Sequence, residues 1–382
     1  MKRILFFCND SHSFLHYRKD LINKLIYLGY RVSCILPRDE LNLKIKKLDI
    51  TVHEIRYKRH FSILYDLITI FSLINILFKN KYDIIQTITL KPNIYGIILA
   101  FIFRIKKRYA LVTGAGPLLN TRVKAIGVIR KFIIYKLIKI SLKLTTKTIF
   151  QNKDDIHDFI KLNFINKNQC TLIEGSGVNK NVFNYKIVNK NDVLKIKHKY
   201  QIKNNEKVIL LVSRMILSKG IIDVFKASKE SKSSHRFIII APYEKSYFFK
   251  EMIDQNTIDK FNNNRLILID RFVSDIKPYL ALCDIAIYPS NYREGIPRFL
   301  IEALAFRKPI ITKKTPGCKA TVSEFKNGLF INNYKDINKK LDYIFEKKSR
   351  YKDYCEESGR LFDLRFESEI IVKQTIAVYE KN

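Results

Sequence analysis

Short apolar runs alternate with longer amphipathic segments along almost all of the 382 residues of the chain. Residues 3–8 (RILFFC), 31–36 (RVSCIL) and 207–212 (KVILLV) are typical of buried strands, and residues 17–29 (YRKDLINKLIYLG) have helical spacing. Buried strands of a parallel sheet read as near-continuous apolar runs, and the crossovers that join them are usually helices. The order of these segments therefore predicts an α/β fold in which parallel sheets are flanked by helices.

This pattern occurs twice, and a polar segment rich in Asn and Lys at residues 176–206 lies between the two series as a predicted linker. Because 382 residues suffice for two packed cores, we expect a first domain at 1–185 and a second at 186–365. Residues 366–382 are expected to form a terminal helix that packs back on the first domain. Ligands of open parallel sheets bind beyond the carboxyl ends of the strands, so a cleft between the two domains is the predicted site.

Lysine and arginine number 70 against 36 aspartates and glutamates, which gives a formal net charge of +34. Such an excess favours an anionic partner, namely a nucleic acid, an anionic membrane or phosphorylated ligands. General enrichment of the chain in Lys, Ile and Asn is an alternative source of the charge. No RRM, KH or helix-turn-helix pattern accompanies it, so a basic nucleic-acid-binding protein is the less favoured interpretation.

Residues 84–153 contain no Asp or Glu. Within them, residues 128–147 (VIRKFIIYKLIKISLKLTTK) alternate Ile and Leu with Lys at helical spacing and include Phe132 and Tyr135. A basic amphipathic helix of this kind binds anionic membrane surfaces. The alternative is an ordinary helix that packs on the sheet with a lysine-rich outer face. The local excess of positive charge favours the membrane interpretation, so we expect the first domain to face the membrane.

Six cysteines are scattered through the chain and form no CxxC pair or Cys/His cluster, which predicts a reduced protein without bound metal. The N-terminal apolar run is too short for a signal peptide. No uncharged apolar stretch is long enough for a membrane-spanning helix. We therefore expect a cytoplasmic location.

Residues 293–317 (REGIPRFLIEALAFRKPIITKKTPG) predict a loop, a short helix starting near Pro297 and a strand. They hold two acids, Glu294 and Glu302. A helix that covered both would separate them by roughly 12 Å at 1.5 Å per residue, with backbone N–H groups suited to phosphate at its start. Carboxylates on either side of a phosphate site suit a nucleotide sugar. The alternative is a solvent-facing Glu302 and a Glu294 that only stabilises the helix start.

Residues 213–220 (SRMILSKG) connect the strand at 207–212 to a predicted helix. Arg214 and Lys219 therefore lie in a loop at the carboxyl edge of the sheet, where two cations can hold a diphosphate and neutralise it as it departs. Gly220 permits a sharp turn of the backbone. The alternative is a pair of solvated basic residues.

The first half of the chain offers candidates of another kind. Residues 113–120 (TGAGPLLN) follow a strand and contain no GxGxxG fingerprint, so Gly114 and Gly116 indicate either a close approach to a ligand or a simple turn. Lys91 also follows a strand and is predicted at the same rim. His16 is placed in the loop after the first strand, where it is a polar contact, a general base or a structural residue.

Taken in order, these stretches resemble the GT4 family of retaining glycosyltransferases. The resemblance covers nearly the whole chain and is carried by SRMILSKG, REGIPRFLIEALAF and NGLFI in the second half and by TLKPNIYG, ALVTGAG and IEGSGVN in the first. In particular, the chain is similar to the bacterial undecaprenyl-diphosphate-linked α-1,3-N-acetylgalactosaminyltransferases of capsule, O-antigen and lipid-linked oligosaccharide synthesis.

The resemblance implies a GT-B fold, in which two Rossmann-like domains face each other across a cleft and the second binds the donor. It implies that Glu294 and Glu302 are the acids of the EX7E motif, which hold hydroxyls of the transferred sugar and of the ribose. Arg214 and Lys219 match the pair that binds the donor diphosphate and replaces a metal ion. The other donor contacts that it implies are Ser290, the backbone N–H groups of Gly295 and Ile296, and Phe272 and Val273 beside the base.

Departures from the family pattern lie around the helix and on the acceptor side. Arg307 stands where many relatives have glycine after the EX7E helix, and Ala320 stands where they often have an acid. TLKPN replaces the histidine-containing loop of many GT4 enzymes. Candidate acceptor or cleft residues are therefore His16, Lys91, Thr113 and Gly114.

The leading hypothesis is a retaining glycosyltransferase that is peripheral on the cytoplasmic face of the inner membrane. It moves a hexose or N-acetylhexosamine from a UDP-sugar to a polyprenyl-diphosphate-linked saccharide in surface polysaccharide synthesis. The alternatives are another GT-B enzyme acting on UDP-sugars, such as an epimerase, and a basic nucleic-acid-binding protein. The cationic pair together with the EX7E acids favours transfer.

Overall fold

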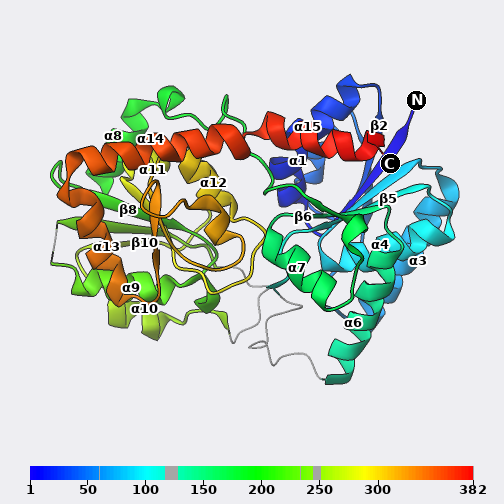
Figure 1. The fold of residues 1–382 in the computed structure, drawn as a ribbon, viewed down its shortest axis with the longest axis horizontal. Coiled ribbons are helices and arrows are strands. Elements are labelled where there is room, and N and C mark those ends of the chain that lie inside the picture. The colour runs from blue at the N-terminus through cyan, green and yellow to red at the C-terminus, as the bar shows by residue number, and fades with distance from the viewer. Residues whose placement is uncertain (60, 117–127, 233, 244–250, 382) are drawn as a thin grey trace. The chain divides into compact units, whose positions relative to one another are not determined.

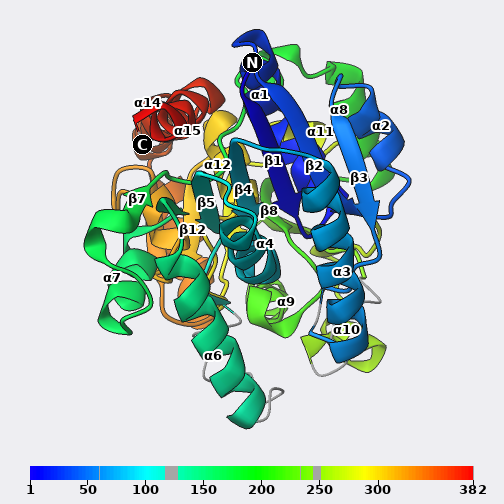
Figure 2. The same ribbon diagram turned by 90° about the vertical axis from the view of Figure 1, so that its right-hand side faces the viewer.

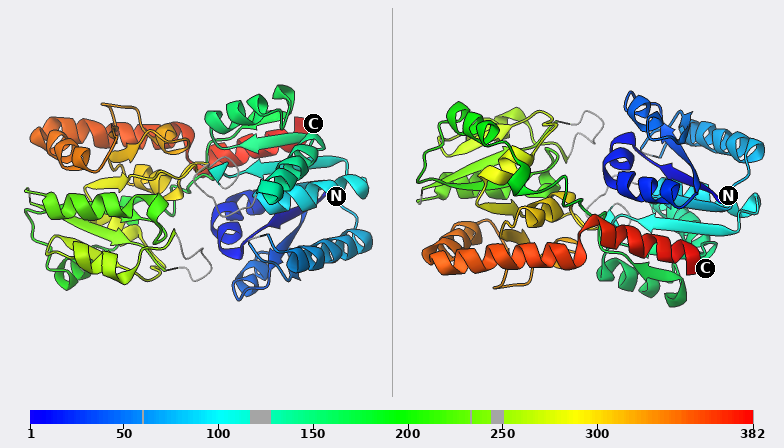
Figure 3. Two further views of the ribbon diagram at one scale, coloured as in Figure 1. Left: turned by 90° about the horizontal axis from the view of Figure 1, so that it is seen from below. Right: turned by 90° about the horizontal axis from the view of Figure 1, so that it is seen from above.

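The computed structural model describes residues 1–59, 61–116, 128–232, 234–243 and 251–381. The chain divides into two compact units, of which unit 1 comprises Met1–Gly177 with Ser368–Asn382 and unit 2 comprises Val178–Glu367 (Figure 1). Both ends of the chain thus belong to unit 1 (Figure 3). The boundary predicted after residue 185 lies inside unit 2, and the predicted linker contains a helix of that unit, α8 (Lys190–Lys199).

Unit 1 is built on a seven-stranded sheet in which all neighbours are parallel. The strand order is β3-β2-β1-β4-β5-β6-β7, so the order reverses between β1 and β4. The strands are β1 (Arg3–Cys8), β2 (Arg31–Pro37), β3 (Thr51–Ile55), β4 (Ile84–Ile88), β5 (Lys107–Val112), β6 (Lys147–Phe150) and β7 (Cys170–Leu172).

Helices cover both faces of this sheet. Leu5 and Phe7 of β1 pack on one face with α3 and α4, while Ile4 and Phe6 pack on the other with α1 and α15. Figure 2 shows α3 beside α4, and α6 packs against α4 on the same face. The helices of unit 1 are α1 (Ser11–Tyr27), α2 (Asn42–Lys46), α3 (Ile63–Lys79), α4 (Leu90–Ile102), α6 (Val128–Lys143), α7 (Lys153–Lys161) and α15 (Ser368–Lys381).

The C-terminal helix α15 belongs to unit 1, and side chains of β5 donate hydrogen bonds to its backbone. The Tyr109 hydroxyl donates to the carbonyl oxygen of Val378 at 3.1 Å, and Lys107 Nζ donates to that of Tyr379 at 2.7 Å. The Tyr379 ring is fully buried and lies 5.1 Å from that of Tyr109. The last helix therefore completes the core of the first unit.

Unit 2 contains a six-stranded parallel sheet with the order β10-β9-β8-β11-β12-β13, which reverses between β8 and β11. Ile209 and Leu211 of β8 pack on one face with α9 and α13, and Val208 and Leu210 pack on the other with α11, α12 and α14. The strands are β8 (Lys207–Val212), β9 (His235–Ile240), β10 (Leu266–Ile269), β11 (Ile285–Tyr288), β12 (Ile310–Lys313) and β13 (Gly328–Ile331). The remaining helices are α9 (Ile221–Glu230), α10 (Gln255–Phe261), α11 (Lys277–Leu282), α12 (Arg298–Ala305), α13 (Lys335–Glu346) and α14 (Lys348–Arg365).

Both units are doubly wound, since each strand order runs outward in two directions from a switch point. The prediction of two Rossmann-like domains with parallel sheets is therefore confirmed. In unit 2 the switch point brings the loops that follow β8 and β11 next to each other, and these loops contain Arg214, Lys219 and Glu294. Over the described ranges, no helix combines the length and apolar character needed to cross a bilayer.

Candidate active site

The loops after β8 and β11 are joined at the switch point of unit 2. The backbone N–H of Asn291 donates to the carbonyl oxygen of Ser218 at 2.9 Å. Gly220 has a positive φ of 76°, and a Cβ atom at this position would collide with the carbonyl oxygen of Pro289. Glycine is therefore required here both for the backbone conformation and for the close approach of the two loops.

Lys219 and Glu294 form a buried ion pair where these loops meet. Lys219 is 4% exposed, and its Nζ lies 2.7 Å from Oε1 of Glu294. The Tyr288 hydroxyl donates to the same oxygen at 2.8 Å, and Ser290 Oγ lies 3.4 Å from it. Oε1 of Glu294 thus lies next to a lysine from the loop after β8 and next to two hydroxyl groups from β11 and the loop that follows it.

The surroundings of Lys219 change the pKa of its ammonium group. Burial lowers the pKa of its ammonium group, the Glu294 carboxylate raises that pKa, and the positive charge of Arg214 lowers it. Its ammonium group also lies 5.6 Å and 5.0 Å from the ring centres of Tyr288 and Tyr292. Two cations and one carboxylate leave a net positive charge at this edge of the sheet, which suits an anionic ligand.

Glu302 lies on α12 and is buried, with only 8% of its surface exposed. Its Oε1 accepts a hydrogen bond of 2.9 Å from Nε of Arg298, one turn earlier on the same helix. Burial raises the pKa of the Glu302 carboxyl, and the Arg298 guanidinium opposes that rise. The alternative of a solvent-facing Glu302 is therefore wrong.

The helix begins at Arg298, so Glu294 lies in the loop before it and a separation of roughly 12 Å along one helix does not apply. Pro297 occupies the N-cap position, and no side chain of the described residues caps this end. The first turn of α12 thus begins beside the buried backbone of Gly295 and Ile296. These backbone groups, together with the helix start, form the kind of end that binds phosphate.

The loop after β12 supports Glu294 from a third direction, which sequence reasoning missed. Gly317 has a φ of 82°, and a Cβ atom there would meet the carbonyl oxygens of Glu294 and Gly295. Thr315 Oγ1 donates to the carbonyl oxygen of Ser290 at 3.3 Å. The dipeptide Pro316-Gly317 is a turn signal in the sequence, but the close approach to Glu294 follows only from the fold.

The remaining donor candidates are distributed over unit 2. Ser290 is fully buried, and its Oγ lies 3.3 Å from the carbonyl oxygen of Ser218 and 3.4 Å from Oε1 of Glu294. Phe272 and Val273 follow β10, which β9 separates from β8, so they lie further along the same sheet edge. The Phe272 side chain is 64% exposed, while Val273 packs against the core that contains Ile296.

Two candidates of unit 1 have surroundings that the sequence did not reveal. Lys91 follows β4 at the predicted edge of the sheet, where it is only 3% exposed and forms an ion pair with Asp66 of α3. His16 lies on α1 rather than in a loop, because Asp10 accepts a hydrogen bond from the backbone of Ser13 and caps a helix that begins at Ser11. The exposed His16 ring lies 4.3 Å from that of His12, centre to centre.

Thr113 and Gly114 line a cavity of about 30 Å³ at the carboxyl ends of β4 and β5, together with Thr89 and Asn93. This volume holds about one water molecule. Thr89 has a φ of 78°, a region that residues other than glycine rarely adopt. Residues 117–120 of the stretch TGAGPLLN lie outside the described residues.

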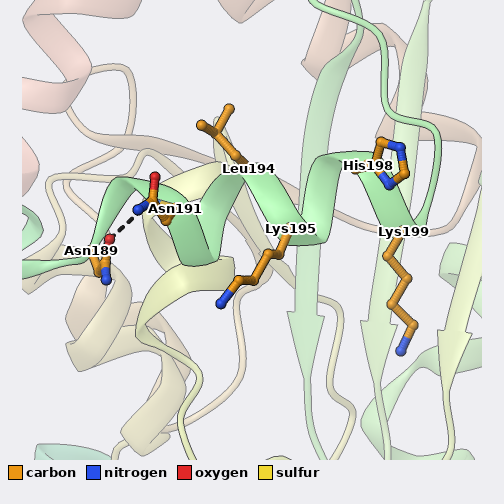
Figure 4. Close-up of a pocket in the computed structure, with 6 residues that line it drawn as sticks. All are labelled: Asn189, Asn191, Leu194, Lys195, His198 and Lys199. Carbon is orange, nitrogen blue, oxygen red and sulfur yellow. Dashed lines mark hydrogen bonds between the residues drawn. The ribbon is translucent and has the colours of Figure 1, made fainter.

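A larger open groove of about 520 Å³ lies elsewhere in unit 2 (Figure 4). Leu194 and Lys195 project from opposite sides of α8 there, and the backbone of Asn191 donates to Asn189 at 2.9 Å. None of its six lining residues belongs to a loop at the carboxyl edge of the sheet. Within the described parts of the chain, no three His, Cys, Asp or Glu side chains come together in a metal-binding arrangement.

Two family models match the two halves of this chain. The model described as glycosyl transferases group 1 matches residues 192–361, and the model described as glycosyl transferase 4-like matches residues 3–152. The chain belongs to the GT4-like glycosyltransferases. The family predicted from the sequence is thereby confirmed, as is the prediction of an enzyme.

Two curated relatives of the glycosyltransferase resemble it over most of their length. It is 25% identical to the N,N'-diacetylbacillosaminyl-diphospho-undecaprenol alpha-1,3-N-acetylgalactosaminyltransferase of Campylobacter jejuni, over 99% of this chain and 98% of that protein. It is 26% identical to the UDP-Gal:alpha-D-GlcNAc-diphosphoundecaprenol alpha-1,3-galactosyltransferase of Escherichia coli, over 72% of this chain and 68% of that protein.

A solved structure with a similar fold is that of HepE from Anabaena in complex with UDP and glucose. It has a TM-score of 0.79 at 16% identity, and the match covers 100% of both chains. The likeness confirms the GT-B fold of the glycosyltransferase, in agreement with the two doubly wound units. The family assignment favours sugar transfer over an epimerase or a nucleic-acid-binding protein.

Proposed function

We propose that this enzyme is a retaining glycosyltransferase that transfers a hexose or N-acetylhexosamine from a UDP-sugar to a polyprenyl-diphosphate-linked saccharide. The observation that carries the proposal is the buried Lys219–Glu294 pair at the switch point, with Arg214 beside it. The names of the two curated relatives support the acceptor class, because both contain an undecaprenol diphosphate. The product would serve in surface polysaccharide synthesis.

In the proposed complex, Arg214 and Lys219 bind the diphosphate of the donor, and the loop before α12 adds backbone N–H groups from Gly295 and Ile296. Glu294 accepts hydrogen bonds from hydroxyls of the transferred sugar, and Glu302 accepts them from the ribose. Phe272 and Val273 lie beside the base. Ser290 keeps Glu294 in place through its hydrogen bond to the carboxylate.

The proposed reaction breaks the bond between the anomeric carbon and the phosphate oxygen and forms a bond from the same carbon to an acceptor oxygen. Attack on the face that the diphosphate leaves retains the anomeric configuration. The departing phosphate oxygen accepts the proton of the acceptor hydroxyl, and Arg214 and Lys219 neutralise the charge that develops on the diphosphate. Because these cations supply that charge, we expect the reaction to need no bound metal.

We further propose that the enzyme is peripheral on the cytoplasmic face of the inner membrane and that unit 1 faces the lipid. Residues 84–153 lack acidic side chains, and Lys136 and Lys143 of α6 are exposed. Arg122 and Lys124, which contribute to the same basic stretch, lie outside the described residues. A lipid-linked acceptor explains a peripheral location, because it confines the reaction to the membrane surface.

A donor screen tests the proposal. Purified full-length enzyme is incubated with individual UDP-sugars, with and without a polyprenyl-diphosphate-linked saccharide, and UDP release is measured. We expect release that depends on the acceptor with at least one donor, and an α-linked product when the donor is α-linked. Conversion of the donor to its epimer without acceptor would support the epimerase instead. Salt-sensitive RNA binding without UDP release from any donor would support the nucleic-acid alternative.

A further inference from the structure

Helix α3 of unit 1 is apolar on both sides. Its inner side packs on the sheet through Leu73 and Leu77, which are 1% and 6% exposed. Its outer side carries four large apolar side chains at spacings of three, four and seven residues, which place them on one face at 3.6 residues per turn. Their exposures are 66% for Leu64, 49% for Leu67, 69% for Phe71 and 81% for Phe78.

The outer face of α3 also lacks charge. Asp66 and Lys79 are the only charged residues of this 17-residue helix. Asp66 is buried on the inner side, where it pairs with Lys91, and Lys79 lies at the last position. A helix on the surface of a globular protein normally presents polar and charged side chains to water, so this face requires an apolar partner.

Exposed apolar side chains also lie at the end of α4, which packs beside α3 (Figure 2). Leu77 of α3 and Leu99 of α4 belong to one hydrophobic cluster. Phe101 and Ile102, which follow Leu99, are 50% and 62% exposed. We call the outward side chains of Leu64, Leu67, Phe71, Phe78, Phe101 and Ile102 the α3/α4 face.

Exposed cations flank both ends of the α3/α4 face. At the start of α3 lie Lys58 and Arg59, and Lys58 Nζ is 3.8 Å from the ring centre of Tyr65. At the other end lie Lys79, Lys81 and, after α4, Arg104. An apolar surface bordered by lysine and arginine fits the boundary between the acyl chains and the anionic headgroups of a bilayer.

We propose that the α3/α4 face is the surface by which this enzyme inserts into an anionic membrane. The inference rests on the proposed function for its reason, because a polyprenyl-linked acceptor is held in such a membrane. It differs from the sequence-based expectation, which assigned the contact to the basic helix α6. There Phe132, Ile133 and Ile140 are also exposed, but they share the surface with Lys136 and Lys143.

A bilayer fits this face better than a second copy of the chain. A symmetric dimer formed through α3 would set the cations at the ends of this face in one copy against cations of the other. The formal net charge of +34 adds to that repulsion. An anionic membrane supplies both the apolar interior and the opposite charge.

The absence of tryptophan from the sequence allows a direct test. Phe71→Trp, Phe132→Trp on α6 and Leu194→Trp on the exposed side of α8 each introduce a single fluorescent reporter. The full-length variants are mixed with vesicles of phosphatidylcholine, with and without phosphatidylglycerol. We expect a blue shift and quenching by brominated lipid for Phe71→Trp with the anionic vesicles, and neither change for Leu194→Trp.

Paired substitutions measure the strength of the contact. Phe71→Ser with Phe78→Ser is expected to weaken sedimentation with anionic vesicles by at least about tenfold, since two large apolar side chains no longer leave water. The matched α6 variant, Phe132→Ser with Ile140→Ser, is expected to lose less. Greater loss in the α6 variant, or a shift of the Phe71→Trp spectrum that depends on protein concentration without vesicles, would overturn the proposal.

Turnover separates this inference from the proposed function. With a short-chain acceptor that dissolves in water, the Phe71→Ser/Phe78→Ser variant is expected to release UDP at the rate of the unaltered enzyme. With a long-chain acceptor in vesicles, its rate is expected to fall with its binding. Failure of the unaltered enzyme to release UDP from any donor would overturn the proposed function, whereas the fluorescence result would still decide the membrane contact.

Discussion

In each unit one buried lysine follows the carboxyl end of a strand beside the switch point. We expect the two lysines to have different roles, one structural and one in ligand binding. Lys91 follows β4 in unit 1 and pairs with Asp66, whereas Lys219 follows β8 in unit 2 and pairs with Glu294. Their exposures are nearly equal, at 3% and 4%. Burial and pairing with a carboxylate therefore do not distinguish a binding site from a structural contact.

The difference lies in the origin of the partners. Asp66 comes from α3 on the face of the sheet, and Lys91 Nζ also donates to the carbonyl oxygen of Lys58 at 2.6 Å, below the rings of Tyr57 and Phe61. This pair is neutral and joins α3 to the first turn of α4. Glu294 instead comes from the neighbouring loop at the sheet edge, where Arg214 adds a positive charge. The second cation at this edge, Arg214, increases the positive potential that an anionic ligand meets there.

The strongest test of this comparison is removal of each lysine. We expect Lys219→Ala to reduce kcat for UDP release by about 10²–10³-fold, as loss of one preorganised cation at a developing negative charge does elsewhere. The fold should persist, because Tyr288 still donates to Glu294. Thermal unfolding measured beside the kinetics separates the two effects. A variant that is folded and turns over at a near-native rate would place the donor diphosphate elsewhere.

The opposite pattern is expected in unit 1. Lys91→Met removes the cationic partner of the buried Asp66 carboxylate, which keeps the hydrogen bond from the backbone N–H of Ser62, and should lower the free energy of unfolding by about 3–5 kcal/mol. Adding Asp66→Leu should restore most of that loss, because an apolar pair of similar volume replaces the ion pair. Urea denaturation of both variants measures the effect. If the double variant were as unstable as the single one, the ion pair would have a structural role beyond fixing the position of α3.

A third test concerns the loops that hold Glu294. Gly317→Ala combines a positive φ with a collision against the carbonyl oxygens of Glu294 and Gly295, whereas Gly29→Ala has a similar φ of 80° with no atom near the new methyl group. We expect Gly317→Ala to lower kcat/KM by roughly 10-fold to 100-fold through displacement of Glu294. Gly29→Ala should affect stability alone, by about 1 kcal/mol. Equal kinetics in the two variants would show that the β12 loop does not position the carboxylate.

The sequence predicted correctly those features of the fold that follow from the strands and their order in a parallel sheet. Apolar runs predicted the strands, and residues that end neighbouring parallel strands must share an edge, so Lys219 and Glu294 were placed together across 75 positions of the sequence. The start of α1 was predicted too late, because the helix was expected from residue 17 and His16 was assigned to the loop before it, whereas Asp10 caps a helix that begins at Ser11.

The features that sequence reasoning missed depend on contacts between distant segments. Nothing near Lys91 indicates that Asp66 lies beside it, because the two residues come from different helices. Burial of Glu302 depends on what packs over α12, and the requirement for Gly317 depends on the path of another loop. The alternation of Ile and Lys predicted a membrane contact for α6. The outward side of α3 could be identified only from the structure, because the burial of Leu73 and Leu77 shows which side packs on the sheet.

The smallest expected effect is a shift in pH dependence that only Lys219 should cause. Because burial lowers the pKa of its ammonium group, Lys219 loses its proton at a lower pH than an ordinary lysine, whose pKa is about 10.4. The unfolded chain then binds more protons than the folded one between the two values, so this group adds stability to the free enzyme as pH rises through that window. Donor binding requires the protonated form, so kcat/KM should fall over the same window.

The bound diphosphate stabilises the ammonium form, so the alkaline limb of kcat should lie at higher pH than the limb of kcat/KM. Lys219→Arg keeps its charge throughout this range and should remove the limb of kcat/KM, with a lower but measurable rate. The Lys91→Met/Asp66→Leu variant should retain that limb unchanged, because it keeps Lys219 and because the lysine that it lacks is not expected to contact the donor. An alkaline limb that survives in Lys219→Arg would assign the titration to another group and remove the functional distinction between the two buried lysines.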